Sequence, residues 1–516
     1  MSNLAKSLHG TGLILSQQLI TRMATFLSNI VLTRISNLKM IGILQDLDLF
    51  HSSLLFLSRE AIRMGLLRNS SKSQHLQFLI NMAYLPILVF FVLITLSVLI
   101  GNSFINEDKV NAYTLYAIAA GLELMTEPLY IYCQNQLLYT IRVSAEGFAF
   151  LLQVGFTLVL ALYSLNENGL LEIDTGIEIY AYSQILFSIV LFLTYAFLLK
   201  RSSASFSFQK LFPKCIENDL KDHKTYIWFD PYLVSVSLSF VIQTIVKHLL
   251  TVGDKLVLVS LGIGDAQKGG YRLVTDLGSL VARILFQPIE ETSRAFFSKS
   301  LTNHDGEEIA INQISESLQM LQTLFKFHII FGAFFVCFGS NYTSVLLKYL
   351  YSKTDNESVN LLSIYCVYVP FMGINGISEA FFQGVGNPKA LAKQTVYMVF
   401  FWATFIGFSY VLMEVFALGS QGLIIANVLN MSQRILFCSV FIIEFFKSCM
   451  KNQQEKSQTF TITGFFPGTK SVWIFFIMSW LITNKTKEFG LVYHLSIGIT
   501  CGLIEVYLMY FLYGFH

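Results

Sequence analysis

The feature that most constrains this chain is a succession of apolar stretches, each long enough to cross a bilayer. A spanning helix needs about 20 mostly apolar residues, and about fourteen such stretches fit here. They cover residues 12–33, 43–65, 76–101, 111–135, 142–164, 177–199, 231–252, 270–294, 319–340, 360–383, 391–415, 420–446, 470–484 and 490–513. Only 13% of the 516 residues are charged, about half the share in a soluble domain. The sequence therefore predicts an all-α, multi-pass membrane protein with about fourteen transmembrane helices.

The loops between these stretches differ in positive charge. Loops on the side of the N-terminus hold about twice as many Lys and Arg residues as the opposite loops. Cytosolic loops carry this excess, so both termini are expected in the cytosol. The first stretch contains Gln17, Gln18 and Arg22, which is unlike the apolar core of a cleavable signal peptide.

This orientation places three glycosylation sequons on the lumenal side, at Asn341, Asn356 and Asn484. Asn341 and Asn484 lie at the edge of predicted spans, close to the membrane. Asn356 lies farther out in its loop, so we expect it to be the glycosylated residue.

Two polar stretches divide the chain. Residues 200–229 separate a first group of six spans, 1–199, from a second group, 230–448. The first polar stretch is expected to be a cytosolic linker that lies on the lipid headgroups. The remainder, 449–516, contains a second linker and two extra spans. We expect two six-helix bundles followed by two C-terminal helices.

Three motifs recur in corresponding spans of the two groups, and this spacing indicates a tandem repeat. The matched pairs are Gln18-x-x-x-Arg22 with Gln243-x-x-x-Lys247, Arg59-Glu60-Ala-Ile-Arg63 with Glu290-Glu291-Thr-Ser-Arg294, and Glu123-x-x-x-Glu127 with Asn375-x-x-x-Glu379. Each group has an even number of spans, so both have the same orientation in the membrane. The pseudo-twofold axis is therefore expected along the membrane normal.

Polar residues inside the spans fall on single helix faces. In the eighth span these are Arg272, Asp276, Ser279, Arg283, Gln287, Glu290 and Arg294, spaced by three or four residues. Similar stripes occur in the first, second and seventh spans. Ionisable residues in a bilayer are costly and generally face the protein interior or a water-filled cavity. We therefore expect these faces to line a central cavity between the bundles.

The cationic members of these stripes are the candidate ligand-binding residues. The candidates for the cavity are Arg22, Arg59, Arg63, Lys247 and Arg283, together with Gln18 and Gln243. Arg22, Lys247 and Arg283 have no opposite charge three or four residues away on the same helix, and Arg434 shares this feature. Guanidinium groups bind phosphate oxygens in bidentate fashion and stay charged when desolvated. The stripes therefore favour an anionic ligand.

The acidic members of the stripes can be interpreted in two ways. They form structural or gating ion pairs, or they contact a ligand. The candidates for structural or gating pairs are Glu60, Glu290, Glu291, Arg294, Asp276, Glu127 and Glu379. The spacing predicts pairs within one helix, Glu60 with Arg63 and Glu290 with Arg294.

The sequence contains no motif that supports several common functional classes. The chain contains no phosphate-binding P-loop, no HExxH zinc motif and no GxSxG motif in a usable context. Its seven cysteines include no CxxC, and its net charge of +2 gives no basic surface for nucleic acid. Asp46-Leu-Asp48 is the nearest approach to a catalytic acid pair. We therefore expect neither an enzyme nor a bound metal or cofactor.

Several segments resemble the eukaryotic Rft family, the oligosaccharide-lipid translocation proteins of the endoplasmic reticulum. The segments are Leu55-Phe-Leu-Ser-Arg59-Glu60-Ala-Ile-Arg63, Glu123-Leu-Met-Thr-Glu127-Pro128, Asp276-Leu-Gly-Ser-Leu-Val-Ala-Arg283-Ile-Leu-Phe-Gln287-Pro288-Ile-Glu290-Glu291, and Tyr365-Cys-Val-Tyr followed by Ile374-Asn375-Gly376. The resemblance implies the multidrug/oligosaccharidyl-lipid/polysaccharide exporter fold, with two six-helix bundles around a cavity. It also implies residence in the endoplasmic reticulum membrane and a role in N-glycosylation with dolichol-linked Man5GlcNAc2.

Three functions follow as hypotheses. The first is a flippase that carries Man5GlcNAc2-PP-dolichol from the cytosolic to the lumenal leaflet by alternating access, with membrane lipid around the dolichol chain. The second is a non-transporting accessory protein that delivers the lipid-linked oligosaccharide to lumenal glycosyltransferases of the N-glycan pathway. The third, a drug or cation antiporter, is disfavoured because the deep carboxylates mostly lie next to an arginine.

Overall fold

The structure is a computed structural model of the whole chain. It describes residues 28, 30–67, 76–101, 109–136, 138–202, 209, 211–220, 223–301, 311–351, 355–452, 462–467 and 470–513. The expected first span, 12–33, therefore lies almost wholly outside the described residues.

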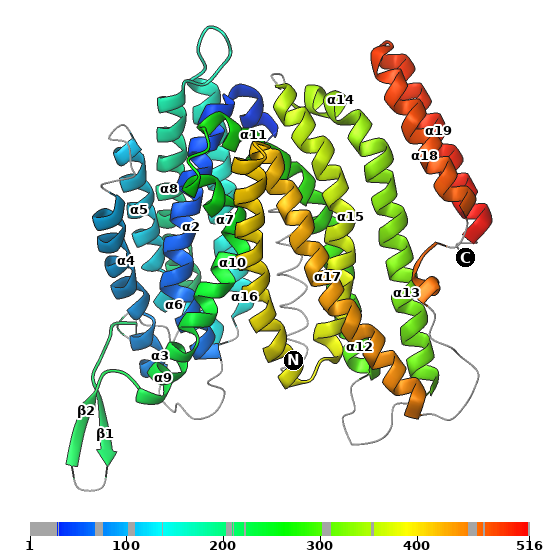
Figure 1. Cartoon of the computed structure of the whole chain (residues 1–516). Coiled ribbons are helices and arrows are strands. Elements are labelled where there is room, and N and C mark those ends of the chain that lie inside the picture. Colours follow the sequence, from blue (N-terminus) through cyan, green and yellow to red (C-terminus); the bar gives the residue numbers. More distant parts are fainter. Residues whose placement is uncertain are drawn as a thin grey trace. The chain divides into compact units, whose positions relative to one another are not determined.

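Contacts along the chain divide it into two compact units, Met1–Gly269 and Gly270–His516 (Figure 1). The first unit contains α2 (Leu38–Leu67), α3 (Leu76–Met82), α4 (Leu85–Gly101), α5 (Val110–Leu124), α6 (Glu127–Asn135), α7 (Tyr139–Tyr163), α8 (Ile173–Ser202), β1 (Ile216–Leu220), β2 (His223–Ile227), α9 (Pro231–Ser239), α10 (Val241–Ser260) and the start of α11 (Asp265–Val281).

The second unit begins within α11. It continues with η3 (Ala282–Phe286), α12 (Gln287–Leu301), α13 (Ile311–Phe334), η4 (Phe335–Gly339), α14 (Ser340–Leu350), α15 (Asn356–Val385), α16 (Pro388–Tyr410), η5 (Val411–Val415), α17 (Gly419–Asn452), η6 (Ile462–Phe465), α18 (Lys470–Lys485), η7 (Thr486–Glu488) and α19 (Leu491–Tyr513).

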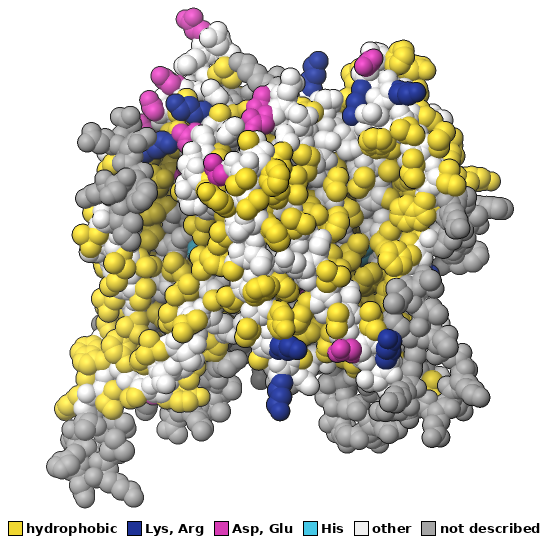
Figure 2. Space-filling view, in the orientation of Figure 1, with side chains coloured by type: hydrophobic (Ala, Val, Ile, Leu, Met, Phe, Trp, Pro, Cys, Tyr) yellow, Lys and Arg dark blue, Asp and Glu magenta, His cyan; other side chains and the backbone are white. Residues whose placement is uncertain are grey.

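The all-α, multi-pass class is confirmed. Within the described ranges, ten helices are long and apolar enough to cross a membrane. Every expected span after the first coincides with one described helix or with two or three helical elements in succession. The total of fourteen and the division into two six-helix bundles stay predictions. On the face drawn in Figure 2, charged side chains gather towards the helix ends and apolar side chains cover the stretch between them.

Some spans are broken, and proline explains two of the breaks. Proline lacks an N–H group and clashes with the preceding helical turn, so it is tolerated at the start of a helix. In the fourth span, α5 ends at Leu124 and α6 begins at Glu127, with Pro128 in the first turn of α6. In the eighth span the π-helical turn η3 lies directly before Pro288.

The turn η3 changes the polar stripe of the eighth span. Its hydrogen bonds join residues five apart, which rotates everything after it relative to an unbroken α-helix. The stripe is therefore divided between α11, which holds Arg272, and α12, which holds Arg294, instead of lying on one continuous α-helix. That its residues share one face stays a prediction.

The linker at 200–229 is more ordered than a loop. β1 and β2 form an antiparallel hairpin, and Asn81 at the end of α3 holds the linker in place. The Asn81 Nδ2 donates to the carbonyls of Lys214 and Trp228, both at 2.7 Å. Its Oδ1 accepts from the Lys214 N–H at 3.0 Å. Because Asn81 is buried, these bonds satisfy a polar group that would otherwise be costly.

The helices α9 and α10 pack on α2 inside the first unit. Gly65 of α2 permits this, because a Cβ there would collide with Ser237 of α9. Grouping by contacts therefore places the division within α11, whereas the repeat predicts it at residue 230.

The start of α11 is fastened to the rest of the first unit. The Lys268 Nζ lies 2.7 Å from Asp46 Oδ2, and the Lys109 Nζ lies 2.9 Å from Asp265 Oδ2. At Gly42 a Cβ would meet the backbone carbonyl of Asp265, so the two helices cross at a distance that only glycine allows. Asp46, the member of the Asp46-Leu-Asp48 pair nearest this crossing, is thus part of an ion pair.

Candidate functional site

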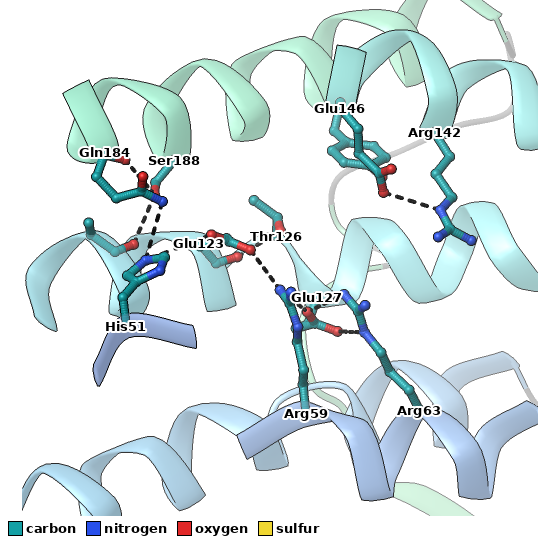
Figure 3. Close-up of polar contacts among 12 residues, drawn as sticks. His51, Arg59, Arg63, Glu123, Thr126, Glu127, Arg142, Glu146, Gln184 and Ser188 are labelled. Carbon is teal, nitrogen blue, oxygen red and sulfur yellow. Dashed lines mark hydrogen bonds and ion pairs between the residues drawn. The ribbon is translucent and has the colours of Figure 1, made fainter. Parts of the chain in front are cut away.

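The strongest polar cluster of the first unit joins α2 to α5 and α6. The Arg59 Nη1 donates to Glu123 Oε1 at 2.8 Å, and it lies 3.5 Å from Glu127 Oε1. The Arg63 Nε and Nη2 donate to the two oxygens of Glu127 at 2.9 and 2.6 Å. Figure 3 shows both guanidinium groups directed from α2 towards these carboxylates. The sequence analysis placed Arg59, Arg63 and Glu127 among the site residues, and the structure brings them together.

The carboxylates of this cluster are the deeply buried members. Glu127 is 1% exposed and Glu123 is 7% exposed, whereas the side chains of Arg59 and Arg63 are 22% and 19% exposed. Two arginines face two carboxylates, so the cluster is electrically balanced. A charge this deep in a membrane protein generally needs such a partner.

A second layer of polar and aromatic groups surrounds the cluster. The Tyr130 ring lies against two guanidinium groups, with its centroid 3.7 Å from the Arg63 Cζ and 4.6 Å from the Arg142 Cζ. Arg142 in turn pairs with Glu146 at 3.1 Å. Cation–π contacts of this kind orient a guanidinium group as well as stabilising it. They limit the rotation of Arg63.

Lys247 on α10 is an exposed cation of the first unit that lies within a candidate membrane span. Its Nζ lies 2.7 Å from the Oε1 of Glu60 on α2, and its side chain is 55% exposed. Gln243, one turn earlier, is also exposed. The next residue, His248, lies 2.8 Å from the Ser53 hydroxyl. Lys247 and Gln243 therefore occupy the open side of α10.

These contacts correct the expected pairing of Glu60. Glu60 pairs with Lys247, whereas the expected pair was with Arg63. Lys247, which has no opposite charge three or four residues away on α10, has its partner on α2. The prediction considered only neighbours on the same helix, three or four residues away. Glu60 faces α10 and therefore finds its partner there, on an adjacent helix.

The second unit has a smaller cluster on α12, α15 and α17. The Arg434 Nε and Nη2 lie 2.7 and 2.6 Å from Glu379 Oε1, so Arg434 is also paired. The Glu290 carboxyl lies against Gly376, in space that a Cβ would fill. Asn375 is buried with its Oδ1 lacking a hydrogen bond.

The pair expected within α12 is absent. In the part of the chain that the structure describes, no ion pair joins Glu290 to Arg294. Glu291 instead accepts a hydrogen bond from Gln287 at 3.1 Å. Earlier in the same span, the Arg272 Nε lies 3.7 Å from Asp276 Oδ2. The two residues lie one turn apart on α12, but Glu290 is partly buried against Gly376 whereas Arg294 is exposed.

Three candidate side chains cannot be placed. Gln18 and Arg22 lie outside the described residues. Arg283 belongs to η3, but its side chain is not among those described. Their roles in a cavity stay predictions, as does the cavity itself.

Two of the sequons differ sharply in exposure. Asn356 is exposed at the first position of α15. Asn341 is 2% exposed, and its Nδ2 donates to Thr483 Oγ1 at 2.7 Å. Glycosylation modifies this same nitrogen on a surface residue, so the geometry agrees with the preference for Asn356 over Asn341.

The sequence analysis missed a polar seam in the C-terminal helices. On α19 it consists of His494, Gly498, Cys501 and Glu505, spaced by 4, 3 and 4 residues, and on α18 of Ser479 and Thr483. The spacing of three and four residues on α19 could have revealed this seam, but it lies outside the spans of the tandem repeat. Across the described ranges, no group of three or more His, Cys, Asp or Glu side chains is arranged to hold a metal ion.

Comparisons with known proteins agree with the fold. A profile of the Rft protein family matches residues 6–513. The Man(5)GlcNAc(2)-PP-dolichol translocation protein RFT1 of Saccharomyces cerevisiae is 32% identical over 492 residues, covering 86% of this chain and 83% of the relative. The protein of the same name from Dictyostelium discoideum is 28% identical and covers 97% of this chain and 94% of the relative.

Solved structures give the same architecture. The lipid II flippase MurJ in an inward closed conformation is similar with a TM-score of 0.58 and 15% identity, covering 95% of this chain and 99% of MurJ. An inward-facing MATE family multidrug resistance transporter of the MOP superfamily has a TM-score of 0.55 and 15% identity, covering 84% of this chain and 96% of the transporter. Sequence identity this low supports the fold alone. With the family profile and the relatives taken together, the chain belongs to the Rft protein family.

Proposed function

We propose that this protein moves Man5GlcNAc2-PP-dolichol from the cytosolic to the lumenal leaflet of the endoplasmic reticulum membrane, for protein N-glycosylation. The observation that carries the proposal is similarity over most of the chain to relatives named as translocation proteins for this lipid. The protein binds its substrate and is not an enzyme. Both termini lie in the cytosol, and transport proceeds by alternating access of a cationic cavity.

The diphosphate of the substrate is bound by cationic side chains. Lys247 is the first contact, because more than half of its side chain is exposed and its ion pair, within the described residues, is with Glu60. Ammonium and guanidinium groups form charge-assisted hydrogen bonds with phosphate oxygens. A diphosphate at Lys247 competes with Glu60, so Glu60 holds the amine in place until the lipid arrives.

The remaining predicted ligands have graded roles. Arg59 and Arg63 are held by Glu123 and Glu127, and their exposed guanidinium edges supply further donors. Arg22 and Arg283 complete the cationic set, and Gln18 and Gln243 bind sugar hydroxyl groups. The other acidic residues of the stripes, Asp276, Glu290, Glu291 and Glu379 with Arg294, serve in helix pairing or gating.

The test uses purified protein in sealed liposomes that carry Man5GlcNAc2-PP-dolichol. Loss of the lipid from the outer leaflet is followed beside protein-free liposomes. The variants are Lys247→Ala and the double variant Arg22→Ala, Arg283→Ala. Lys393→Ala is the matched control, because Lys393 is an exposed cation on another membrane helix whose neighbour is the Tyr397 ring. The proposal requires transport by the wild type and by the control, and a loss of about tenfold or more per removed contact, the size of one charged hydrogen bond.

The paired arginines favour one alternative. Because Arg63 and Glu127 satisfy each other so fully, the cluster resembles a structural clamp, as expected of an accessory protein that delivers the lipid to lumenal glycosyltransferases. Exchanging these two residues distinguishes the roles. If the exchange restores glycosylation in cells while either single change abolishes it, pairing is what matters. Folded protein that moves no lipid in liposomes would overturn transport and leave the accessory role.

A further inference from the structure

Helices α18 and α19 enclose a polar seam against α14 and η4. At one end the Tyr342 hydroxyl donates to the carbonyl of His494 at 2.6 Å, and the Thr486 hydroxyl lies 2.8 Å from His494 Nδ1. In the middle Asn341 bridges the carbonyl of Cys337 in η4 to the Thr483 hydroxyl. This seam lies outside the tandem repeat and has no part in the proposed function.

Glu505 lies at the end of the seam opposite His494. Glu505 is 2% exposed, and within the described residues no ion pair reaches its carboxyl group; the one polar side chain beside it is the hydroxyl of Ser479, which is not in good hydrogen-bond geometry with either oxygen. It follows Leu491, the first residue of α19, by about 21 Å along the helix axis, at 1.5 Å per residue. The carboxyl group therefore lies well inside a helix that is apolar enough to cross the membrane.

The groups around Glu505 are polar but uncharged. Ser479 of α18 has its hydroxyl beside the carboxyl group, and Cys501 lies one turn earlier on α19. Cys337 of η4, on a third element, is close enough to interact electrostatically with Glu505. Within the described residues, these two thiols are the titratable groups that act on Glu505, and no Lys or Arg does.

An ionised carboxylate without a partner is strongly disfavoured in such surroundings, because burial removes the water that stabilises its charge. We propose that Glu505 is a proton-binding site, protonated while α19 is packed on α18 and η4. The Ser479 hydroxyl and the two thiols then surround a neutral acid. Release of the proton would leave a buried charge, so proton binding and the packing of the C-terminal helices are linked.

Labelling with dicyclohexylcarbodiimide tests the protonation state directly. This apolar reagent reacts with protonated carboxyl groups in membranes. The carboxyl oxygen bonds to the carbodiimide carbon, and the proton moves to a nitrogen. Trypsin cleavage after Lys487 releases fragment 488–516, in which mass spectrometry locates the label. Glu379, which is paired with Arg434, is the internal control within the same protein.

We expect the label on Glu505 and little label on Glu379. The Glu505→Gln variant should carry no label at position 505. The extent of labelling should be the same in NaCl and in choline chloride. Labelling should fall about tenfold per pH unit once the proton is lost. Suppression by Na⁺ at constant pH would overturn the proposal in favour of a cation site.

If no label forms, the pH dependence of the melting temperature tests the proposal instead. A proton bound in the folded state alone makes the wild type lose stability as the pH rises. Glu505→Gln keeps the shape of the neutral acid without the titration, so its melting temperature should depend less on pH. Equal pH dependence of the two proteins, together with no label, would overturn the proposal. A weaker dependence in Glu505→Gln would support it.

Discussion

The pairing of Arg63 with Glu127 predicts a large loss of stability when one partner is removed. Glu127 is 1% exposed and accepts two hydrogen bonds from Arg63, at 2.9 and 2.6 Å. Glu127→Leu leaves the guanidinium group of Arg63 buried to about four-fifths without its partner. Breaking a buried pair on one side costs about 3–5 kcal/mol. Since 1 kcal/mol corresponds to about 2–4 °C for a unit of this size, the melting temperature should fall by about 6–20 °C.

The assay is the apparent melting temperature in detergent–lipid micelles at one scan rate. The matched control is Glu146→Leu, which breaks the pair with Arg142. That carboxylate side chain is 34% exposed and belongs to an i,i+4 pair. Exposed pairs contribute about 0–1 kcal/mol, so this control should lower the melting temperature by only a few degrees.

The double variant Arg63→Met, Glu127→Leu completes the cycle. Replacing both charges by apolar residues of similar volume is often neutral, so the double variant should be more stable than Glu127→Leu alone. The interaction energy from the cycle isolates the pair from the effects of the separate substitutions. A double variant as unstable as the sum of the single ones, or a loss no larger than that of Glu146→Leu, would refute this account of the cluster.

Three further predictions concern other parts of the chain. Gly42→Val should destabilise the first unit by several kcal/mol, because its side chain meets the backbone at the start of α11; thermal unfolding measures this loss. Asn356→Gln should remove an endoglycosidase-sensitive shift on a gel, whereas Asn341→Gln should leave the shift and lower the melting temperature. Arg434→Ala should destabilise the second unit by about 3 kcal/mol or more, and simultaneous replacement of its carboxylate partner by Leu should recover part of the loss.

The spans could be predicted because bilayer thickness restricts the length of an apolar helix. The stretch expected at 43–65 is observed as α2, Leu38–Leu67, and that at 177–199 as α8, Ile173–Ser202. Both helices extend beyond the apolar residues. Hydropathy does not show where a helix ends in the headgroup region, because backbone hydrogen bonding continues there among polar residues.

The hairpin of the linker and the π-helical turns could not be predicted in this way. The position of the linker depends on Asn81, which is more than 130 residues away from Lys214 in sequence and bonds backbone groups on either side of the β1–β2 hairpin. The turn η3 depends on how the helix accommodates Pro288 among its neighbours. Neither relationship appears as a periodicity in the sequence.

The ion pairs show most clearly what the sequence analysis could and could not predict. It identified Arg59 and Arg63 as inward-facing, because charged residues cannot face lipid, and Glu127 as a candidate for a structural pair. It paired Arg63 with Glu60, whereas the partner of Arg63 is Glu127 on α6, because local spacing considers neighbours on one helix only. The partner of Arg434 lies 55 residues away on α15. Only the packing of α15 against α17 brings the two together.

The positions equated by the repeat also differ in charge between the units. Arg59 corresponds to Glu290, and Glu123 corresponds to Asn375. In the first unit this arrangement gives an arginine that is held by carboxylates. In the second it gives a carboxylate against Gly376, and the cation comes from a third helix. A repeat that keeps helix positions while reversing charge can bind an anionic headgroup asymmetrically. Under the proposed function, we therefore expect a diphosphate to be bound first in the first unit, which contains Arg59, Arg63 and the exposed Lys247 of α10.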